Sequence, residues 1–212
     1  MLLRRHLEVC SKKNKIPQDK FFFEKIYSKK NFKFYFDKDE EVINEILKHK
    51  KSGKVLDLGC GEGGNSLFLA EKGFEVVCVD ISKTAIKKIK EEIKRRKIKL
   101  GAIVTDLEKF KFKENYDIII ATGVFHLISK KKVFKILEEI KNHTKPRRLN
   151  IFKVLLHEDP TEKENDYGYY FKSNELKKIY FDWKIFKYRE YKDYDEKERQ
   201  FNRVGFLVAG KV

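Results

Sequence analysis

The sequence is poor in cysteine, proline, methionine and tryptophan, with three, three, one and one of these residues among 212. Cys10, Cys60 and Cys78 form no C-x-x-C pair, and an odd number of cysteines does not suit a disulfide framework. Disulfides persist in oxidising compartments, so their expected absence favours a reduced environment. We therefore predict a cytoplasmic protein with reduced thiols.

Long apolar runs are also missing. No stretch approaches the roughly eighteen apolar residues that are needed to cross a bilayer. The opening Met-Leu-Leu-Arg-Arg leads into charged sequence and not into the apolar core of a signal peptide. We therefore expect no membrane partner.

Arginine is scarce for so basic a chain, because the net charge of +16 comes from 40 lysines and only 9 arginines. Clustered basic residues suit nucleic acid, but arginine is preferred where phosphates and bases are bound in bidentate fashion. Nine of the basic residues lie in 82–100, on the polar side of a helical pattern whose apolar stripe is Ala85, Ile86, Ile89 and Ile93. A solvated helix surface is favoured, and a nucleic-acid partner remains the alternative.

A glycine-rich stretch after residue 58 organises the chain. Residues 55–58 have the pattern of a strand, 59–64 that of a tight turn, and the residues after Gly63 that of an apolar helix. Glycine lets the backbone turn sharply and lets a ligand approach it, and the helix start directs free N–H groups at that ligand. Asp80 closes a second apolar strand about twenty residues later, where nucleotide folds place an acid on a ribose. The stretch predicts a nucleoside cofactor.

The identity of that cofactor depends on one acid. Gly59, Gly61 and Gly64 satisfy the G-x-G-x-x-G pattern of dinucleotide enzymes. Asp57 precedes them, however, and a carboxylate suits a cationic group such as the ammonium of methionine better than a pyrophosphate. The run D-L-G-C-G-E-G at 57–63 resembles the first motif of the class I S-adenosyl-L-methionine-dependent methyltransferases, D-x-G-x-G-x-G. The resemblance implies S-adenosyl-L-methionine as cofactor and S-adenosyl-L-homocysteine as its product.

The remaining pattern alternates strands and helices. Further strands are expected at 75–79, 100–105, 116–122, 148–156, 183–191 and 200–210, and helices begin after Asp37 or Asp39, Ser82 and Ser129, the last stopped by Pro146, with a short helix at 175–180. We predict one α/β domain over 1–212: a Rossmann-like, mostly parallel sheet of seven strands with helices on both faces. A C-terminal antiparallel hairpin, joined by 193–199, closes the sheet, as is typical of methyltransferases and not of dinucleotide folds.

The resemblance assigns cofactor contacts by position. It implies that Asp80 binds the ribose and that Asp106, after the third strand, accepts a hydrogen bond from the adenine amino group. A turn-starting role for Asp106 is the alternative. The full set of implied cofactor-binding residues is Asp57, Gly59, Cys60, Gly61, Gly63, Asn65, Asp80, Ile81, Asp106, Leu107, Thr122 and Phe125.

The acceptor side is less defined by the sequence. His126 follows the fourth strand and is a candidate general base, with a packing or capping role as the alternative. Segment 1–36 is basic and aromatic, and is expected to be either an accessory cover of the sheet edge or a lid. Adjacent residues on a loop seldom converge on one ion, so no metal is expected at His157 and the two acids after it. Candidates for the acceptor pocket are Phe34, Tyr35, His126, His157, Tyr167, Tyr169 and Tyr170.

One branch of the class, the TehB-like tellurite-resistance methyltransferases, is similar over residues 34–212. The shared features are D-L-G-C-G-x-G-x-N-S at 57–66, the Asp106–Leu107 pair, and an aromatic-K-x-x-E-L segment at 171–176 before a tryptophan-led strand. The hairpin at 191–199 departs from the family pattern. The family's methyl acceptors, tellurium and selenium oxyanions, are therefore not assumed for this chain.

The segment after the fourth strand bears on the acceptor. Residues 121–126 lack the D/N-P-P-Y and Pro-Cys motifs of base-modifying methyltransferases. We therefore expect in-line methyl transfer to a small molecule, assisted by positioning and desolvation. An RNA-modifying or nucleic-acid-binding protein is the first alternative, and a silent cofactor-binding regulator is the second. The oligomeric state is left open.

Overall fold

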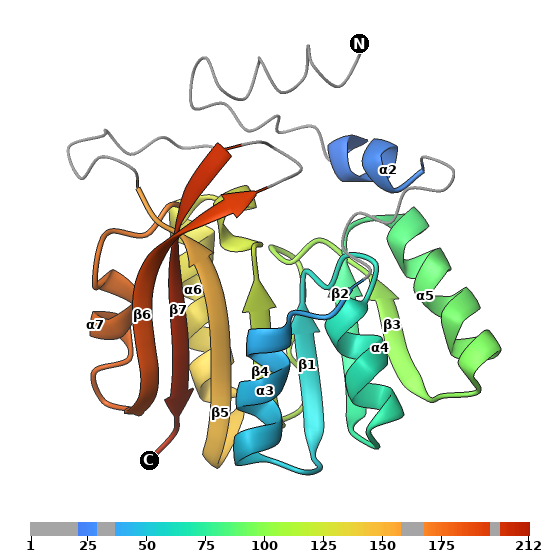
Figure 1. The fold of residues 1–212 in the computed structure, drawn as a ribbon, viewed down its shortest axis with the longest axis horizontal. Coiled ribbons are helices and arrows are strands. Elements are labelled where there is room, and N and C mark those ends of the chain that lie inside the picture. The colour runs from blue at the N-terminus through green and yellow to red at the C-terminus, as the bar shows by residue number, and fades with distance from the viewer. Residues whose placement is uncertain (1–20, 29–36, 158–167, 196–199) are drawn as a thin grey trace.

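A computed structural model describes residues 21–28, 37–157, 168–195 and 200–212 (Figure 1). The elements in chain order are α2 (Phe21–Tyr27), α3 (Glu40–His49), β1 (Lys54–Leu58), α4 (Gly64–Glu71), β2 (Glu75–Asp80), α5 (Lys83–Arg96), β3 (Leu100–Val104), β4 (Tyr116–Thr122), η1 (Phe125–Leu127), α6 (Lys130–Asn142), β5 (Thr144–Leu155), α7 (Glu175–Ile179), β6 (Lys184–Asp195) and β7 (Gln200–Gly210). None of these helices is long and apolar enough to cross a membrane.

The strands form one seven-stranded sheet in the order β3-β2-β1-β4-β5-β7-β6. β1 to β5 run parallel to one another, whereas β7 lies antiparallel between β5 and β6. The predicted fold class is therefore confirmed, including the closing antiparallel hairpin. Because parallel strands end on the same edge, the segments after β1, β2, β3 and β4 all meet at one edge of the sheet.

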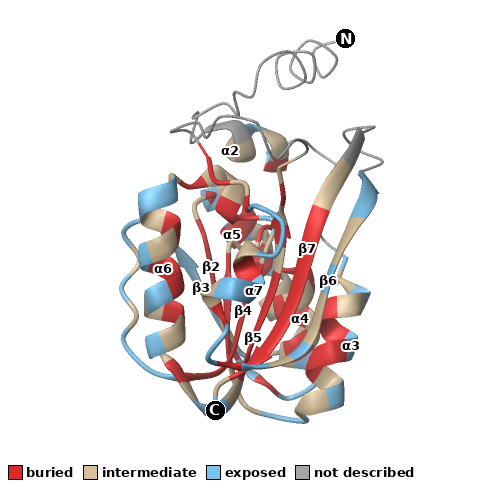
Figure 2. Ribbon diagram, turned by 90° about the vertical axis from the view of Figure 1, so that its left-hand side faces the viewer, coloured by how far each residue is buried: buried red, intermediate tan, exposed pale blue. Residues whose placement is uncertain are grey.

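Two apolar layers cover the sheet. On one face α3 and α4 bury Val42, Ile46 and Leu69 against Val55, Ile118 and Ile120, with α5 extending this layer. On the other face α6 and α7 cover Leu56, Ile119 and Phe152. β4 is buried over almost its whole length, as its unbroken apolar sequence predicts for a central parallel strand. Figure 2 shows this burial concentrated in the sheet and on the inner sides of the helices.

The predicted end of α6 was wrong. Pro146 does not stop this helix, which ends at Asn142, and β5 begins at Thr144 instead of 148. The pairing of β5 with β4 shifts register after Thr144 and resumes at Leu149, so Pro146 lies in an irregular part of the strand. Its missing N–H costs little there, because that part forms no regular ladder with β4.

The start of α3 was predicted at either of two acids, and the structure selects Asp39. Its side chain accepts hydrogen bonds from the backbone N–H groups of Glu41 and Val42, as an N-cap does. The carboxylate also pairs with Lys153 Nζ at 2.7 Å. Asp39 therefore caps the helix and fixes it to β5 at once.

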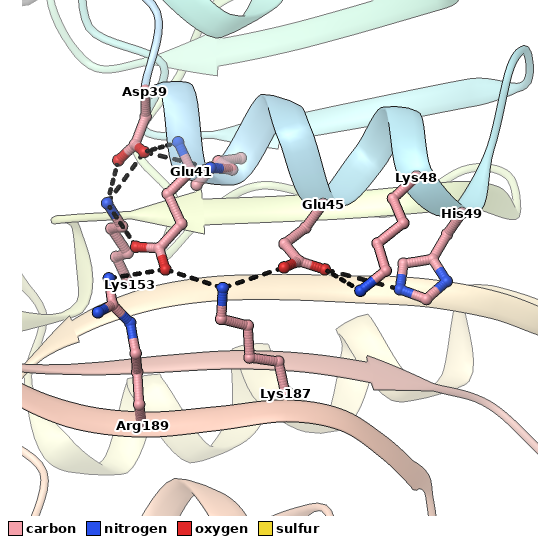
Figure 3. A network of polar contacts seen from close by, with 9 residues as sticks. Asp39, Glu41, Glu45, Lys48, His49, Lys153, Lys187 and Arg189 are labelled. Carbon is pink, nitrogen blue, oxygen red and sulfur yellow. Dashed lines mark hydrogen bonds and ion pairs between the residues drawn. The ribbon is translucent and has the colours of Figure 1, made fainter.

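A charged network extends this link to the C-terminal hairpin (Figure 3). Glu41 on α3 pairs with Lys187 at 3.2 Å and Arg189 at 2.7 Å, both on β6. Glu45, one turn later, also pairs with Lys187, at 3.0 Å. Single surface ion pairs contribute little, but a connected set on half-buried side chains holds the helix in one position. The network therefore fixes α3 across the β5–β7–β6 part of the sheet.

Candidate functional site

The glycine-rich turn between β1 and α4 is held against the end of β2. Gly59, Gly61 and Gly63 have φ of 72°, 53° and 83°, a region that side chains other than glycine rarely adopt. The N–H groups of Gly59 and Cys60 donate to the carbonyl of Val79 at 2.9 and 3.0 Å. A Cβ on Gly59 would lie 2.4 Å from Val124, so packing also requires glycine there. The predicted strand, turn and helix are all present.

Asp57 is a buried acid directly before this turn. Only 2% of it is exposed, and its carboxylate accepts a hydrogen bond from Ser66 Oγ at 2.6 Å. Burial raises the pKa of Asp57 to about 6, with the Asp80 charge adding to the shift and the Ser66 bond opposing it. Among the residues that the structure describes, no basic side chain forms an ion pair with it. An unpaired buried carboxylate fits a ligand that brings a cation, such as the ammonium of S-adenosyl-L-methionine.

Asp80 joins the turn to the start of α5. Its two carboxylate oxygens accept hydrogen bonds from the N–H groups of Gly61 at 2.8 Å and Ser82 at 2.9 Å. Burial raises its pKa, and these bonds oppose that rise. The N–H of Ile81 also contributes, and because a carboxylate has about four acceptor positions, capacity remains for a ligand hydroxyl. Asp80 can therefore position the turn and bind a ribose together.

Two other predicted cofactor residues, Asn65 and Asp106, accept hydrogen bonds from backbone N–H groups of the chain. Asn65 Oδ1 accepts from the backbone N–H of Asp39 at 2.7 Å, which connects the turn to the start of α3. Asp106 accepts from the N–H of Glu108 at 3.1 Å, the turn-starting role that was the alternative interpretation. Both remain predicted cofactor contacts.

The remaining predicted cofactor contacts are distributed around the same edge. Cys60 lies within the turn, and Ile81 follows β2. Thr122 ends β4 and is half-buried, whereas Phe125 is 1% exposed and packs edge-on against Phe152 and Phe171. Leu107 is half-buried against the same core. Their contact with a cofactor stays a prediction.

The acceptor-side candidates fall into two groups. The ring centre of Tyr170 lies 6.1 Å from that of His126 and 5.9 Å from that of His157. Tyr169 is instead in the core, 3% exposed, with its hydroxyl bonded to Glu175. Phe34, Tyr35 and Tyr167 lie outside the described residues. Among the acceptor-side candidates in the described residues, His126, His157 and Tyr170 therefore lie together.

His126 is a poor candidate for a general base. Its Nδ1 is buried without a hydrogen-bond partner in the described structure, and burial lowers the pKa of the imidazole to about 4. A base with so low a pKa is neutral at pH 7 but weak. In its neutral form the side chain can donate or accept one hydrogen bond at Nδ1, according to the tautomer.

The thiols and acids of the described residues do not suggest other chemistry. Cys60 and Cys78 are free, and burial raises the pKa of the Cys60 thiol well above its ordinary value. A protonated thiol is a weak nucleophile. No group of three or more His, Cys, Asp or Glu that could hold a metal occurs among the described residues, which exclude Glu158 and Asp159.

Sequence reasoning missed Glu24, which links α2 to the cofactor edge. Its carboxylate accepts from Ser82 Oγ at 2.6 Å and from the N–H of Thr84 at 3.2 Å, both at the start of α5. Burial raises the pKa of Glu24, but these hydrogen bonds outweigh it and the net shift is downward. Tyr27 is buried beside Ala85 in the same contact. Since Glu24 lies 58 residues from Ser82, no local spacing could have indicated this pair.

Replacing Glu24 with alanine should release α2 from α5. The acceptor of the Thr84 N–H would be lost at a helix start, which costs about 1 kcal/mol. Hydrogen exchange should rise at 21–28 and change little at the opposite edge of the sheet. If 1–36 acts as a lid, the dissociation rate of S-adenosyl-L-homocysteine should also increase. An unchanged dissociation rate, with faster exchange, would identify α2 as a structural cover only.

Comparisons with known proteins agree with this geometry. The chain is 32% identical over 137 residues to a probable S-adenosyl-L-methionine-dependent methyltransferase TehB of Haemophilus influenzae, covering 65% of this chain and 48% of that protein. It is 32% identical over 149 residues to a protein of Eikenella corrodens described as hemagglutinin 1, covering 70% of this chain and 50% of that one. The chain thus spans about half the length of these curated relatives.

A solved structure resembles this chain more completely. The crystal structure of TehB from Haemophilus influenzae superposes with a TM-score of 0.75 and 27% identity, covering 91% of this chain and 67% of that one. The model of the family described as tellurite resistance protein TehB matches residues 17–209. The turn at Asp57, the acid at Asp80 and the closing hairpin lie within this match. Because the match includes most of the chain, the chain belongs to the TehB family, as its motifs predict.

Proposed function

We propose that this chain transfers the methyl group of S-adenosyl-L-methionine to a small molecule. The observation that carries the proposal is Asp57, a buried acid without a described cation partner at the cofactor edge of a TehB family fold. Such an acid is costly unless a ligand supplies the opposite charge. The methionine ammonium does so, whereas a dinucleotide pyrophosphate would repel it. The cofactor class and the enzyme class are those of the family.

The chain's own residues position and enclose the reactants in this proposal. Asp57 binds the methionine end, Asp80 binds the ribose end, and Asp106 lies where the adenine is expected. When bound, the cofactor supplies an activated sulfonium methyl group. What remains for the protein is to align the acceptor and to exclude water, and both effects accelerate transfer without a dedicated catalytic side chain.

The acceptor is proposed to bind beside His126, His157 and Tyr170. These rings offer apolar faces, and His126 Nδ1 is a buried polar atom without a described partner that donates or accepts a hydrogen bond according to the tautomer. A small molecule with one hydrogen-bonding group and an apolar or polarisable part suits this combination. A phosphate backbone would instead favour arginine at such positions.

The proposal predicts where a labelled methyl group should go. The protein, given S-adenosyl-L-methionine labelled in its methyl group and fractionated cell extract, should label a low-molecular-weight fraction. The Asp57→Asn variant is the negative control, because it should lose cofactor binding. Label that appears only in the RNA fraction would contradict the small-molecule proposal and support the alternative. Cofactor binding without labelling of any fraction would favour the silent regulator.

A further inference from the structure

A hollow lies at the edge of the sheet opposite the cofactor turn. It has a volume of about 310 Å³ and is lined mainly by His49, Lys50, Arg147, Lys184, Phe186 and Lys211. These residues come from the end of α3, the beginnings of β5 and β6, and the end of β7, near the C label in Figure 1. We refer to this hollow as the basic pocket. Its volume is at the lower limit of ordinary small-molecule sites.

The basic pocket carries concentrated positive charge. Within the described structure no Asp or Glu side chain lines it. The nearby Asp117 is already paired with Lys145 at 3.0 Å and Arg148 at 2.7 Å, and Glu45, 3.7 Å from His49, is paired with Lys187 at 3.0 Å. These acids are therefore engaged elsewhere. The local field favours an anion in the pocket.

Two of the cations are available for a ligand. Arg147 and Lys184 are exposed and form no ion pair with the described residues, and Nζ of Lys184 lies 5.2 Å from the centre of the Phe186 ring. Lys211 is different, because its Nζ donates to the carbonyls of Lys141 and Thr144 at 2.7 and 2.8 Å. Lys211 therefore builds the pocket wall, whereas Arg147 and Lys184 can bind an anion.

The strained backbone at Arg147 indicates that the basic pocket has a function. Arg147 has φ of 59°, a conformation that costs about 1 kcal/mol or more for a residue other than glycine. Its N–H donates to the carbonyl of Lys211 at 3.0 Å, which fixes the irregular start of β5 to the segment after β7. Glycine or asparagine would relieve the strain. The strained position presents a guanidinium to the pocket instead.

An aromatic ring adds a flat apolar wall. Phe186 rests on the backbone of Gly210, where a Cβ would lie 2.5 Å from the ring, and its ring centre is 4.5 Å from that of His49. Despite these contacts 42% of Phe186 remains exposed. An exposed ring beside unpaired cations is the combination by which proteins bind a base and its phosphate together.

We propose that the basic pocket binds a nucleotide, with the phosphate on Arg147 and Lys184 and the base against Phe186 and His49. The guanidinium can bind two phosphate oxygens at once, and the ammonium adds a second charge. The nucleotide is either free or one residue of a single-stranded RNA, because both present the same chemistry to the pocket. This site is separate from the cofactor site and does not depend on the proposed methyl transfer.

The single tryptophan of the chain lies behind the pocket wall, against Lys211, and offers a readout of binding. Trp183 precedes Lys184, is 7% exposed, and its ring centre lies 5.9 Å from Nζ of Lys211. Titration of the protein with adenosine monophosphate should therefore change the tryptophan emission in a saturable way. Excitation at 295 nm limits absorption by the nucleotide. Inorganic phosphate should bind more weakly, because it lacks the base.

A pair of double variants tests the assignment to these residues. Arg147→Asn with Lys184→Gln removes two charges from the pocket, and asparagine tolerates the backbone conformation at 147. The matched control, Lys87→Gln with Lys90→Gln, removes two charges from the exposed side of α5. The pocket variant should weaken adenosine monophosphate binding by about tenfold or more, the loss of a charge-assisted contact. The control should change it less than about twofold.

Further outcomes distinguish a free nucleotide from single-stranded RNA, and others would contradict nucleotide binding. A short single-stranded RNA that binds more tightly than the mononucleotide, loses affinity steeply with salt and is weakened by the pocket variant identifies RNA as the source. Equal affinities identify a free nucleotide. Equal losses in both double variants, no saturable change, or phosphate binding as tight as that of the nucleotide would each overturn the proposal. Unchanged S-adenosyl-L-homocysteine binding by the pocket variant would show that it is folded.

Discussion

Replacing Asp57 with asparagine should weaken the binding of S-adenosyl-L-methionine by about a hundredfold or more at pH 7.5, and should at the same time stabilise the protein without ligand. The loss of affinity follows from removing the carboxylate that faces the ammonium, an interaction worth about 3 kcal/mol when buried. Titration calorimetry with S-adenosyl-L-homocysteine, which carries the same ammonium, measures it. Asparagine retains an oxygen to accept the hydrogen bond from Ser66.

The gain in stability follows from the raised pKa of Asp57. A shift from the ordinary 3.8 to about 6 means that ionisation of Asp57 disfavours the folded state by about 3 kcal/mol above pH 6. A raised pKa contributes stability that is complete below about pH 4 and is lost as the pH rises through 6. The variant should thus melt about 6 °C or more above the parent at pH 7.5. The difference should shrink toward zero near pH 4.

The two effects of this substitution have opposite pH signatures. Binding needs the ionised acid, so the affinity of the parent for S-adenosyl-L-homocysteine should fall as the pH drops below 6, whereas that of the variant should not follow this titration. A variant that binds as tightly as the parent would refute the role of Asp57. Equal melting temperatures of parent and variant at pH 7.5 would show that its burial does not raise the pKa.

Replacing Gly61 with valine should abolish measurable cofactor binding. Gly61 has φ of 53°, its N–H is bonded to Asp80, and it is buried in the middle of the turn. A branched side chain strains this conformation and occupies the space through which a ligand approaches the backbone. We expect affinity for S-adenosyl-L-homocysteine to fall by at least about a hundredfold, together with about 2 kcal/mol of stability.

Gly73 provides the matched control for this strain. It has φ of 87° in the loop between α4 and β2, and a Cβ there would meet nothing within 4 Å. Gly73→Val should therefore lose comparable stability in thermal unfolding and keep normal cofactor binding. If both variants lose binding equally, the effect is global destabilisation. If Gly61→Val binds normally, the cofactor does not lie against this turn.

Much of the fold was predictable because the chain is locally consistent. The continuous apolar run of β4, the alternation of β6 and β7 and the Ser82 cap of α5 each indicate one structure, and the structure has it. The end of α6 was not predictable from Pro146, because the proline lies where β5 interrupts its pairing. Such an interruption depends on the neighbouring strand and not on local sequence.

Some residues of the candidate site were likewise predictable from the sequence, and others were not. Asp57 and Asp80 were found because a motif fixes their spacing and strand ends fix their place. Glu24 was not found because its partners are more than fifty residues away. The basic pocket also escaped sequence reasoning, since Lys50, Arg147 and Lys184 are brought together only by the sheet. The excess of lysine was interpreted as solvated surface, which gives no sign of where cations meet an exposed ring.

The position of β7 has a consequence for the synthesis of the protein. β7 lies inside the sheet, between β5 and β6, although all six other strands precede it in the sequence. While a ribosome has still to release residues 200–210, β5 presents an unpaired edge that includes Ile151 and Phe152. Open apolar edges pair readily with other chains. We therefore expect the nascent protein to be prone to aggregation until β7 has paired with β5 and β6. Slow release from the ribosome or a missing chaperone should lower the yield of folded protein.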